Sequence, residues 1–414
     1  MATAPKKNAV YNRTLITALT CAMFFMFAMT TDAVGEIIKI AKVDMGLTNL
    51  QASAFHLSTM FAIAGSGIFL GFLADRLGRK TTIIIGLSLY GVASAAFFLG
   101  KDFYLYMALL FISGVAIGIF KTAALALIGD ITDSTEEHTT TMNMLEGFFG
   151  LGAIVGPMLV VFFHSRGVSW TYLYLLAALL CAVMVIAALY SKYPPTVKST
   201  DEPINLGRTF RLLKNKYALG FSLAIAMYVA SEVAIFVWLP SFLEGYTGTE
   251  IAVMFATYAV MIFFILRAAG RFMGIWVLKK FSWTSVMAVF SGIIFLCFLG
   301  SAILGKDAAV FLLPLSGLFM SMIYPTLNSK GISCFHKSEH GAIAGLILFF
   351  TAAAAFIGPL LMAFVADTFG GGDMRIGFVL ATGFAGGLFI FAIYNWKVDP
   401  ASTALAQANE TEYQ

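Results

Sequence analysis

Six ionisable side chains lie inside long apolar stretches of the sequence: Asp32, Lys121, Glu146, Glu232, Arg267 and Lys330. A charge at the centre of a bilayer costs about 2.5–3.5 kcal/mol on insertion scales, and residues that persist there mark solute or ion pathways. The sequence has no Walker motif, which argues against ATP as the energy source. It also shows no grouping of a nucleophile with a base and a third residue. These residues predict binding and proton transfer, and we expect no enzyme.

Lys121 is the most informative of the six, because it lies within the apolar run from Phe103 to Gly129. It precedes Asp130 by nine residues, which is roughly 13 Å of helix at the α-helical rise per residue. At that depth the ammonium cannot snorkel comfortably to the surface. Two explanations stay open. Lys121 binds a solute anion or takes part in proton coupling, or it forms a structural pair with an acid such as Glu146.

Three carboxyl groups are candidates for carrying a proton: Asp32, Glu146 and Glu232. Asp32 is about 28 Å of helix beyond Arg13, which places it in the outer part of the first apolar stretch. A buried carboxyl that binds and releases a proton during a cycle supplies the chemistry of a proton symporter. The alternative for Asp32 is a hydrated residue at the mouth of its helix.

A second set of residues has the spacing of a solute-binding surface. Glu232 follows Tyr228 by one helical turn, so both lie on one face. Together with Trp238 they form a platform for a polyhydroxylated or aromatic solute, because ring faces stack and polar tips form hydrogen bonds. Trp238 is equally consistent with a residue at the membrane interface.

Three further residues, on two other predicted spans, complete the predicted binding surface. Tyr324 and Asn328 are also one turn apart, and Pro325 between them can break the helix and free a backbone carbonyl. Arg267 either holds a carboxylate of the solute through two hydrogen bonds or pairs with Glu232.

Composition indicates which solvent surrounds these residues. The chain is 60% hydrophobic and 12% charged, whereas soluble proteins average about 45–50% apolar and about 25% charged residues. The four cysteines show no disulfide or metal pattern. The net charge of +4 does not indicate nucleic acid, because the cations lie in loops between apolar segments. We expect a polytopic membrane protein with no cofactor and no metal.

Twelve apolar stretches are long enough to span a membrane, which takes about 20 residues. They lie near residues 14–36, 52–74, 82–100, 103–128, 141–164, 169–190, 217–243, 250–275, 283–304, 308–331, 341–365 and 376–396. The first stretch has a basic start like a signal peptide, but no convincing small-residue cleavage site follows it. We therefore predict an uncleaved first span.

The chain divides into two halves around its longest polar stretch between spans. We predict an all-α membrane protein with an N-terminal six-helix bundle at 1–190, a linker at 191–216, a C-terminal six-helix bundle at 217–400 and a disordered tail at 401–414. The linker and the loop around Arg79 are rich in cations, so the positive-inside rule predicts that both termini are cytoplasmic. GAIVGPML at 152–159 is echoed by AAFIGPLL at 354–361. Such an internal repeat is typical of transporters whose site lies between the halves.

The turn after the second span carries a family signature. Its sequence, GFLADRLGRK at 71–80, resembles the cytoplasmic motif of the major facilitator superfamily. That resemblance implies a twelve-helix fold with a latch that holds the outward-open state. In the latch, an aspartate faces a helix N-terminus and is held by arginine. The implied latch residues are Gly71, Asp75, Arg76, Gly78 and Arg79, with Arg271 in the second half.

Four other segments resemble the fucose/glucose–galactose:proton symporter group: residues 146–157, 228–239, 270–274 and 319–326. Two departures stand out. The acid that carries the proton in the first span of that group falls at Gly35 here, and Lys121 replaces the acid of its Gly-x-x-x-Glu-Thr-Ala-Ala motif. The group's coupling residues therefore cannot be transferred, and its specificity for neutral sugars does not follow.

We expect a monomeric, proton-coupled transporter in a bacterial inner membrane. It would import a small hydrophilic solute, either sugar-like, a sugar acid or another anionic or zwitterionic metabolite. A neutral sugar with Lys121 in the coupling pair is one alternative. Efflux is another, because GAIVGP resembles the start of the antiporter signature, although the glycines that normally follow are missing. A non-transporting receptor is the third, against which the latch sequence argues. The expected partners are solute, protons and lipid, without nucleic acid.

Overall fold

The computed structural model describes residues 11–47, 49–195, 211–243 and 245–411. Every regular element within these residues is a helix. Eleven helical segments are long and apolar enough to cross a membrane, and Ala54–Leu70 is a shorter apolar helix. Together they match the twelve spans predicted from the sequence.

The first half contains six long helices and two short ones. The long helices are α1 (Arg13–Thr31), α3 (Asn49–Leu70), α5 (Arg79–Ala95), α6 (Phe103–Ile131), α7 (Thr135–Ser165) and α8 (Tyr172–Tyr190). The short ones are α2 (Val34–Asp44) and α4 (Leu73–Arg76). Asn12, Asp102 and Ser134 each accept a hydrogen bond from a backbone N–H in the first turn of the following helix, which fixes where α1, α6 and α7 begin.

In the second half, two of the predicted spans are interrupted. Its helices are α10 (Lys216–Phe242), α11 (Glu250–Thr257), α12 (Ala259–Lys280), α13 (Trp283–Leu304), α14 (Lys306–Met320), α15 (Ile323–Ser333), α16 (His340–Gly370) and α17 (Met374–Val398). The break between α14 and α15 falls just before Pro325, as predicted. Because proline has no N–H, the carbonyl of Ser321 loses the partner that a regular helix would supply.

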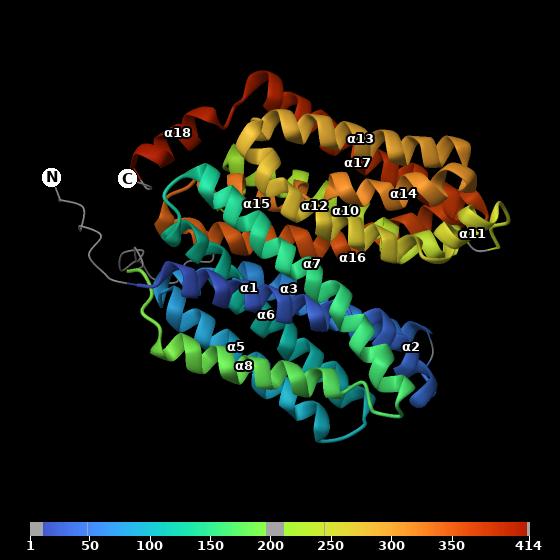
Figure 1. The fold of residues 1–414 in the computed structure, drawn as a ribbon, viewed down its shortest axis with the longest axis horizontal. Helices are drawn as coiled ribbons and strands as arrows, with labels where there is room; N and C mark the ends of the chain where they lie inside the picture. The colour runs from blue at the N-terminus through green and yellow to red at the C-terminus, as the bar shows by residue number, and fades with distance from the viewer. Residues whose placement is uncertain (1–10, 48, 196–210, 244, 412–414) are drawn as a thin grey trace.

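Figure 1 shows the two halves as separate bundles lying side by side, with α1 to α8 below and α10 to α17 above. Helix α3 packs against α16, and α7 packs against α12 and α15. The α3–α16 seam is very close: a Cβ on Gly345 would lie closer than 3.0 Å to the carbonyl oxygen of Gly67. The halves therefore touch through backbone at this point.

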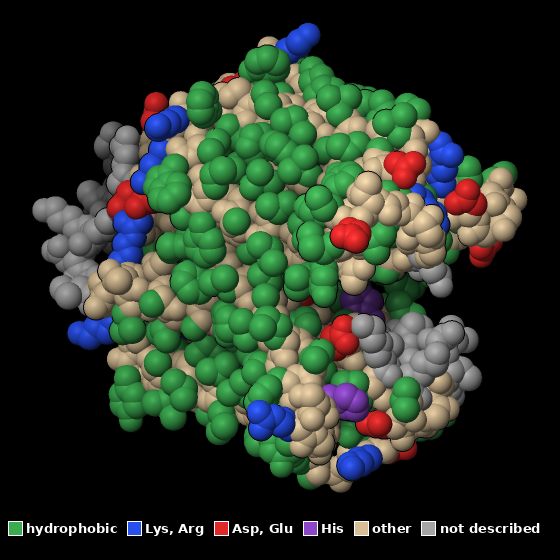
Figure 2. All heavy atoms as spheres, turned by 45° about the vertical axis from the view of Figure 1, so that its right-hand side comes forward, with side chains coloured by type: hydrophobic (Ala, Val, Ile, Leu, Met, Phe, Trp, Pro, Cys, Tyr) green, Lys and Arg blue, Asp and Glu red, His purple; other side chains and the backbone are tan. Residues whose placement is uncertain are grey.

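The two ends of the molecule differ. We call the end with the start of α1, helix α4 and the α6–α7 turn the latch end, and the end with α2 and α11 the open end (Figure 1). Figure 2 shows a hollow between the halves that faces the open end.

One prediction about the chain end was wrong. Residues 402–411, expected to be disordered, form helix α18 (Ser402–Thr411), which packs against α7 and α15 at the latch end. Leu405 and Ala408 are buried, and the side-chain oxygen of Asn409 accepts the N–H of Thr135 at 2.9 Å. These two residues lie one turn apart and form a narrow apolar stripe on one face of the helix. The prediction missed the stripe because the tail is polar on average. Of the predicted linker, residues 196–210 lie outside the described chain.

Glycine in the GAIVGP segment is required for the first half to fold. A Cβ on Gly156 would lie closer than 3.0 Å to the carbonyl oxygen of Met29 in α1, where a backbone atom cannot give way. We expect Gly156→Ala to lower the free energy of unfolding by about 3 kcal/mol, the upper part of the usual range for overpacking. Thermal unfolding in detergent measures this. Gly383→Ala, where nothing lies within 4 Å, is the control, and an equal loss in both variants would contradict the argument.

Candidate functional site

Six charged residues from both halves form one group between the bundles, which we call the site cluster: Asp32, Lys121 and Glu146 from the first half, and Glu232, Arg267 and Arg271 from the second. All are buried except Asp32, which is half-buried at the C-terminal end of α1. Asp32 interacts electrostatically with Arg267, Glu232, Arg271 and Lys121. The three acids balance the three cations, so the cluster as a whole is neutral when all are ionised.

Aromatic rings surround the ammonium of Lys121. Its Nζ lies 4.7 Å from the ring centre of Phe27, 5.2 Å from Phe149, 5.7 Å from Phe24 and 5.9 Å from Tyr324. Each such contact is worth about 0.5–2 kcal/mol, with the larger values in desolvated surroundings. Among the ion pairs of the described residues, none includes Lys121. Ring faces therefore offset its charge, and the structural ion pair with Glu146 that the sequence left open is not formed.

Glu146 is paired with the other half of the molecule instead. Arg271 Nη2 lies 3.3 Å from Glu146 Oε2, and Arg271 Nη1 donates to the Glu146 carbonyl at 2.7 Å. Glu146 Oε1 is buried without a hydrogen-bond partner. Arg271, assigned to a second latch on the sequence, thus joins the site cluster.

Two residues of the predicted platform on α10, Tyr228 and Glu232, contact each other. Tyr228 donates its hydroxyl proton to Glu232 Oε1, and Arg267 Nε lies 2.7 Å from the same oxygen. Of the two sequence alternatives for Arg267, the structure thus shows the pair with Glu232. The Arg267 N–H is poorly aimed at that oxygen and forms no hydrogen bond there. The Tyr228 ring lies 6.2 Å from the ring of Tyr324 on α15.

Several buried polar atoms near this platform have no hydrogen-bond partner. They include the Tyr324 hydroxyl and both side-chain polar atoms of Asn328. An unsatisfied buried polar group costs about 1–3 kcal/mol. A solute or ordered water that supplied these hydrogen bonds would recover that free energy, so these atoms fit the predicted binding surface.

Two predicted or candidate residues lie elsewhere. Trp238 Nε1 donates to the carbonyl of Pro359 on α16 at 3.1 Å, and this bond ties α10 to its neighbour within the second half. Lys330 Nζ donates to the carbonyl of Thr135 at 3.2 Å, which places it at the latch end. Within the part of the chain that the structure describes, neither side chain forms a hydrogen bond or ion pair with the site cluster.

Residues of the motif that family resemblance predicts to be a latch contact the other half of the molecule. Asp75 accepts the N–H groups of Gly341 and Ala342, each at 2.9 Å, at the start of α16 in the other half. Arg79 pairs with Asp75, contacts Asp130 at 3.0 Å and donates to the Lys337 carbonyl at 2.7 Å. Burial raises the pKa of the Asp75 carboxyl to about 6, and Arg79 opposes that rise.

Not every latch residue has the implied role. The side chain of Arg76 is exposed, and Arg79 is the arginine that holds Asp75. Gly78 has a φ of 89°, a backbone conformation that favours glycine, and it turns the chain into α5. A Cβ on Gly71 would lie closer than 3.0 Å to the Cα of Gly345, so this glycine allows the halves to touch.

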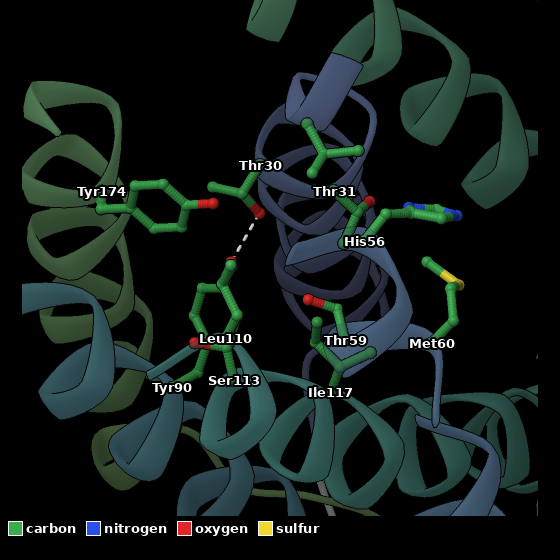
Figure 3. A pocket seen from close by; sticks show the side chains of 11 residues that line it. Thr30, Thr31, His56, Thr59, Met60, Tyr90, Leu110, Ser113, Ile117 and Tyr174 are labelled. Atoms are coloured by element: carbon green, nitrogen blue, oxygen red, sulfur yellow. Dashed lines mark hydrogen bonds between the residues drawn. The ribbon is translucent and has the colours of Figure 1, made fainter. Parts of the chain in front are cut away.

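A small cavity lies inside the first half and adjoins the site cluster, because Thr31, one of its lining residues, contacts Asp32. Figure 3 shows hydroxyl groups of Thr30, Thr59, Tyr90 and Tyr174 around it, with His56 on the far side from Tyr174. No member of the site cluster lines it, and it has room for about one water molecule. The cavity is therefore too small to hold a solute, and the site cluster between the halves is the candidate solute site.

Sequence reasoning missed the rings around Lys121. Phe149 lies in a segment that was singled out, but Phe24 and Phe27 did not stand out among 40 phenylalanines. Their spacing of three residues on α1 is the one signal that could have found them, because it places both on the same helix face.

Comparison with known proteins gives consistent matches. The family model described as Major Facilitator Superfamily matches residues 14–359. The L-fucose-proton symporter of Escherichia coli (strain K12) is 26% identical over 411 residues, which cover 89% of this chain and 91% of that protein. Protein TsgA of Escherichia coli O17:K52:H18 (strain UMN026 / ExPEC) is 23% identical, covering 76% of this chain and 79% of that protein.

Two solved structures share the fold. The transporter FucP in the outward conformation superposes with a TM-score of 0.76 at 22% identity, covering 91% of this chain and 98% of that one. The proton:xylose symporter XylE has a TM-score of 0.72 at 12% identity, covering 97% of this chain and 99% of that one. At these identities the structures support the fold and leave the solute open.

Proposed function

Because the chain belongs to the major facilitator superfamily, we propose that it is a proton-coupled secondary transporter that imports a small hydrophilic solute with a negative charge. Sugar acids and other anionic or zwitterionic metabolites are the solute class. The observation that carries the proposal is the Lys121 ammonium, which is buried among rings with no carboxylate paired to it. Such a charge can bind an anionic group strongly, because little water competes for it.

Other side chains at and near the site cluster fit such a solute. The Tyr228 and Tyr324 rings offer apolar faces for a sugar-sized body. Asn328 and the Tyr324 hydroxyl offer unpaired hydrogen-bonding atoms. Arg267 is held by Glu232, and it can turn to a carboxylate of the solute if that pair opens. Both halves of the site come from one chain, so a monomer is sufficient.

Asp32 is the preferred proton carrier. It is half-buried, and no ion pair within the described chain includes it, whereas Glu146 and Glu232 are each paired with an arginine. The hydroxyl of Thr31 donates a weak hydrogen bond to Asp32 Oδ1 at 3.4 Å. A carboxyl that binds and releases a proton next to a solute site couples the proton gradient to the solute gradient.

We infer the orientation of the chain in the membrane from the distribution of its cations. The cations of the loop at Arg79 and of the linker indicate that the latch end is cytoplasmic, and the start of α1 and helix α18 lie at that end. The hollow then faces the outside, as an importer requires for loading. Escherichia coli relatives support a bacterial inner membrane.

A neutral sugar remains the second candidate, and the name of the L-fucose-proton symporter favours it. Lys121 would then belong to the coupling pair. Neither efflux nor a receptor role gains support from a specific contact within the described residues.

Uptake in proteoliposomes tests the proposal. A pH jump, acid outside, is applied with a panel of labelled sugar acids, amino acids and neutral sugars. We expect an anionic or zwitterionic solute to accumulate and a protonophore to abolish the accumulation. Accumulation of a neutral sugar alone, or uptake that ignores the pH gradient, would contradict the proposal.

A further inference from the structure

One aromatic ring is shared by two cations of opposite halves. Phe149 on α7 lies 5.2 Å from Lys121 Nζ of the first half and 5.6 Å from the Arg271 guanidinium carbon of the second. Glu146 lies one turn before Phe149 on the same helix face. A single carboxylate on α7 thus lies near two buried cations, one in each half of the molecule.

Glu146 uses only part of its bonding capacity. Its Oε2 faces Arg271, whereas Oε1 is buried and has no hydrogen-bond partner. Glu146 also interacts electrostatically with Lys121, and the ring of Phe149, one turn after Glu146, contacts the Lys121 ammonium. The carboxylate is therefore paired with one cation and close enough to the other to be attracted by it.

The two pairings must respond differently to rocking of the halves. Lys121 and Glu146 belong to the same bundle, so the backbone positions of the two residues stay fixed relative to each other while their side chains can turn. Arg271 reaches Glu146 only because α7 and α12 touch, where Gly150 would place a Cβ 3.1 Å from the Cβ of Ala268. Separation of the halves at the latch end removes Arg271 from α7.

We propose that Glu146 exchanges Arg271 for Lys121 when the halves separate at the latch end, and that this exchange displaces the anionic group of the solute from Lys121. This inference rests on the proposed function for its last step. An uncompensated buried carboxylate is strongly unfavourable, and Lys121 is the cation that remains in the same bundle.

In the state open to the outside, Arg271 keeps Glu146 away, so Lys121 is available to the solute. In the state open to the cytoplasm, Glu146 competes with the solute and lowers its affinity. A ligand-affinity difference of this kind between the two states drives release.

The exchange is tested without any solute, by spin-label distances across the latch end. Labels at Lys192, after α8, and Lys280, at the end of α12, are exposed and lie in different halves. They are introduced into a cysteine-free protein in lipid nanodiscs. Arg271→Gln is expected to raise the ratio of long to short distances about tenfold, because the pair that holds the short-distance state is lost.

Lys121 then supplies the decisive comparison. With Arg271 in place, Lys121→Met is expected to lower that ratio about tenfold, because Glu146 then loses its partner in the long-distance state only. Lys121→Arg, which keeps the charge, is expected to leave the ratio unchanged. In a Glu146→Gln background, Lys121→Met is expected to have no effect.

Two results would overturn the inference. One is an unchanged ratio in Lys121→Met with Arg271 in place, and the other is an equal effect of Lys121→Met in the Glu146→Gln background. The charge-conserving pair Lys121→Arg and Arg271→Lys keeps the test informative if a neutral variant does not fold. Because no solute is present, a failure here is distinct from a failure of the proposed function, which only the uptake panel reveals.

Discussion

Lys121→Ala is expected to raise the Km for an anionic solute about 10- to 100-fold while leaving proton coupling intact. A hydrogen bond to a charged group contributes about 1.5–3 kcal/mol, and each 1.4 kcal/mol is a factor of about ten in affinity. The rings around the ammonium keep the site shaped, because Phe27 and Phe149 also contact each other at 5.4 Å between ring centres. Initial rates of uptake against solute concentration measure the effect.

The matched variants separate charge from shape. Lys121→Arg keeps a cation and is expected to retain most of the affinity, whereas Lys121→Met keeps the bulk and should behave like Lys121→Ala. If Lys121→Met transported the anion with an unchanged Km, the ammonium would not be the counter-ion of the solute.

Gly345→Ala is expected to prevent closure at the latch end. The added methyl group would lie closer than 3.0 Å to the carbonyl oxygen of Gly67 and 3.0 Å from the Cα of Gly71, both in the other half. Overpacking of this kind costs about 1–3 kcal/mol, which shifts the equilibrium between the two states roughly 5- to 150-fold. Spin-label distances across the latch end should lengthen, and uptake should slow because the return step is blocked.

This effect differs from the one expected at Gly156. The contact of Gly345 lies between the halves, so relief comes from rocking, whereas the contact of Gly156 with α1 lies within one bundle. Gly345→Ala should therefore keep nearly the wild-type unfolding temperature. Gly65→Ala on α3, with nothing within 4 Å, is the control. Short distances in Gly345→Ala equal to those of the wild type would show that the seam does not set the conformation.

The spans could be predicted from the sequence because their signals are local: apolar runs of spanning length, and a glycine at the turn at 78, act through neighbouring residues. The break before Pro325 was predictable for the same reason, since the missing N–H is a property of one residue. Gly71, Asp75 and Arg79 contact the other half of the molecule, and their grouping was expected from the family resemblance of the whole motif.

The pairings inside the site could not be predicted in the same way. Whether Lys121 contacts Glu146 or a set of rings depends on how α1, α6 and α7 are rotated about their axes. Because these helices are largely apolar, the periodicity of their sequences does not determine that rotation. Arg271 was assigned to a latch because the sequence does not show that α7 and α12 pack against each other. Helix α18 was missed because its burial depends on the surface formed by α7 and α15.

The most direct test of the account compares two solutes that differ only in a carboxylate, galacturonate and galactose, in a pH-jump uptake experiment with the wild type and Lys121→Glu. If galacturonate represents the solute class, the account predicts that the wild type accumulates it in preference to galactose and that Lys121→Glu takes up neither anion nor sugar at a comparable rate. Accumulation of galactose by the wild type, with Lys121→Glu still moving galactose under altered proton coupling, would contradict it and would assign Lys121 to the coupling pair.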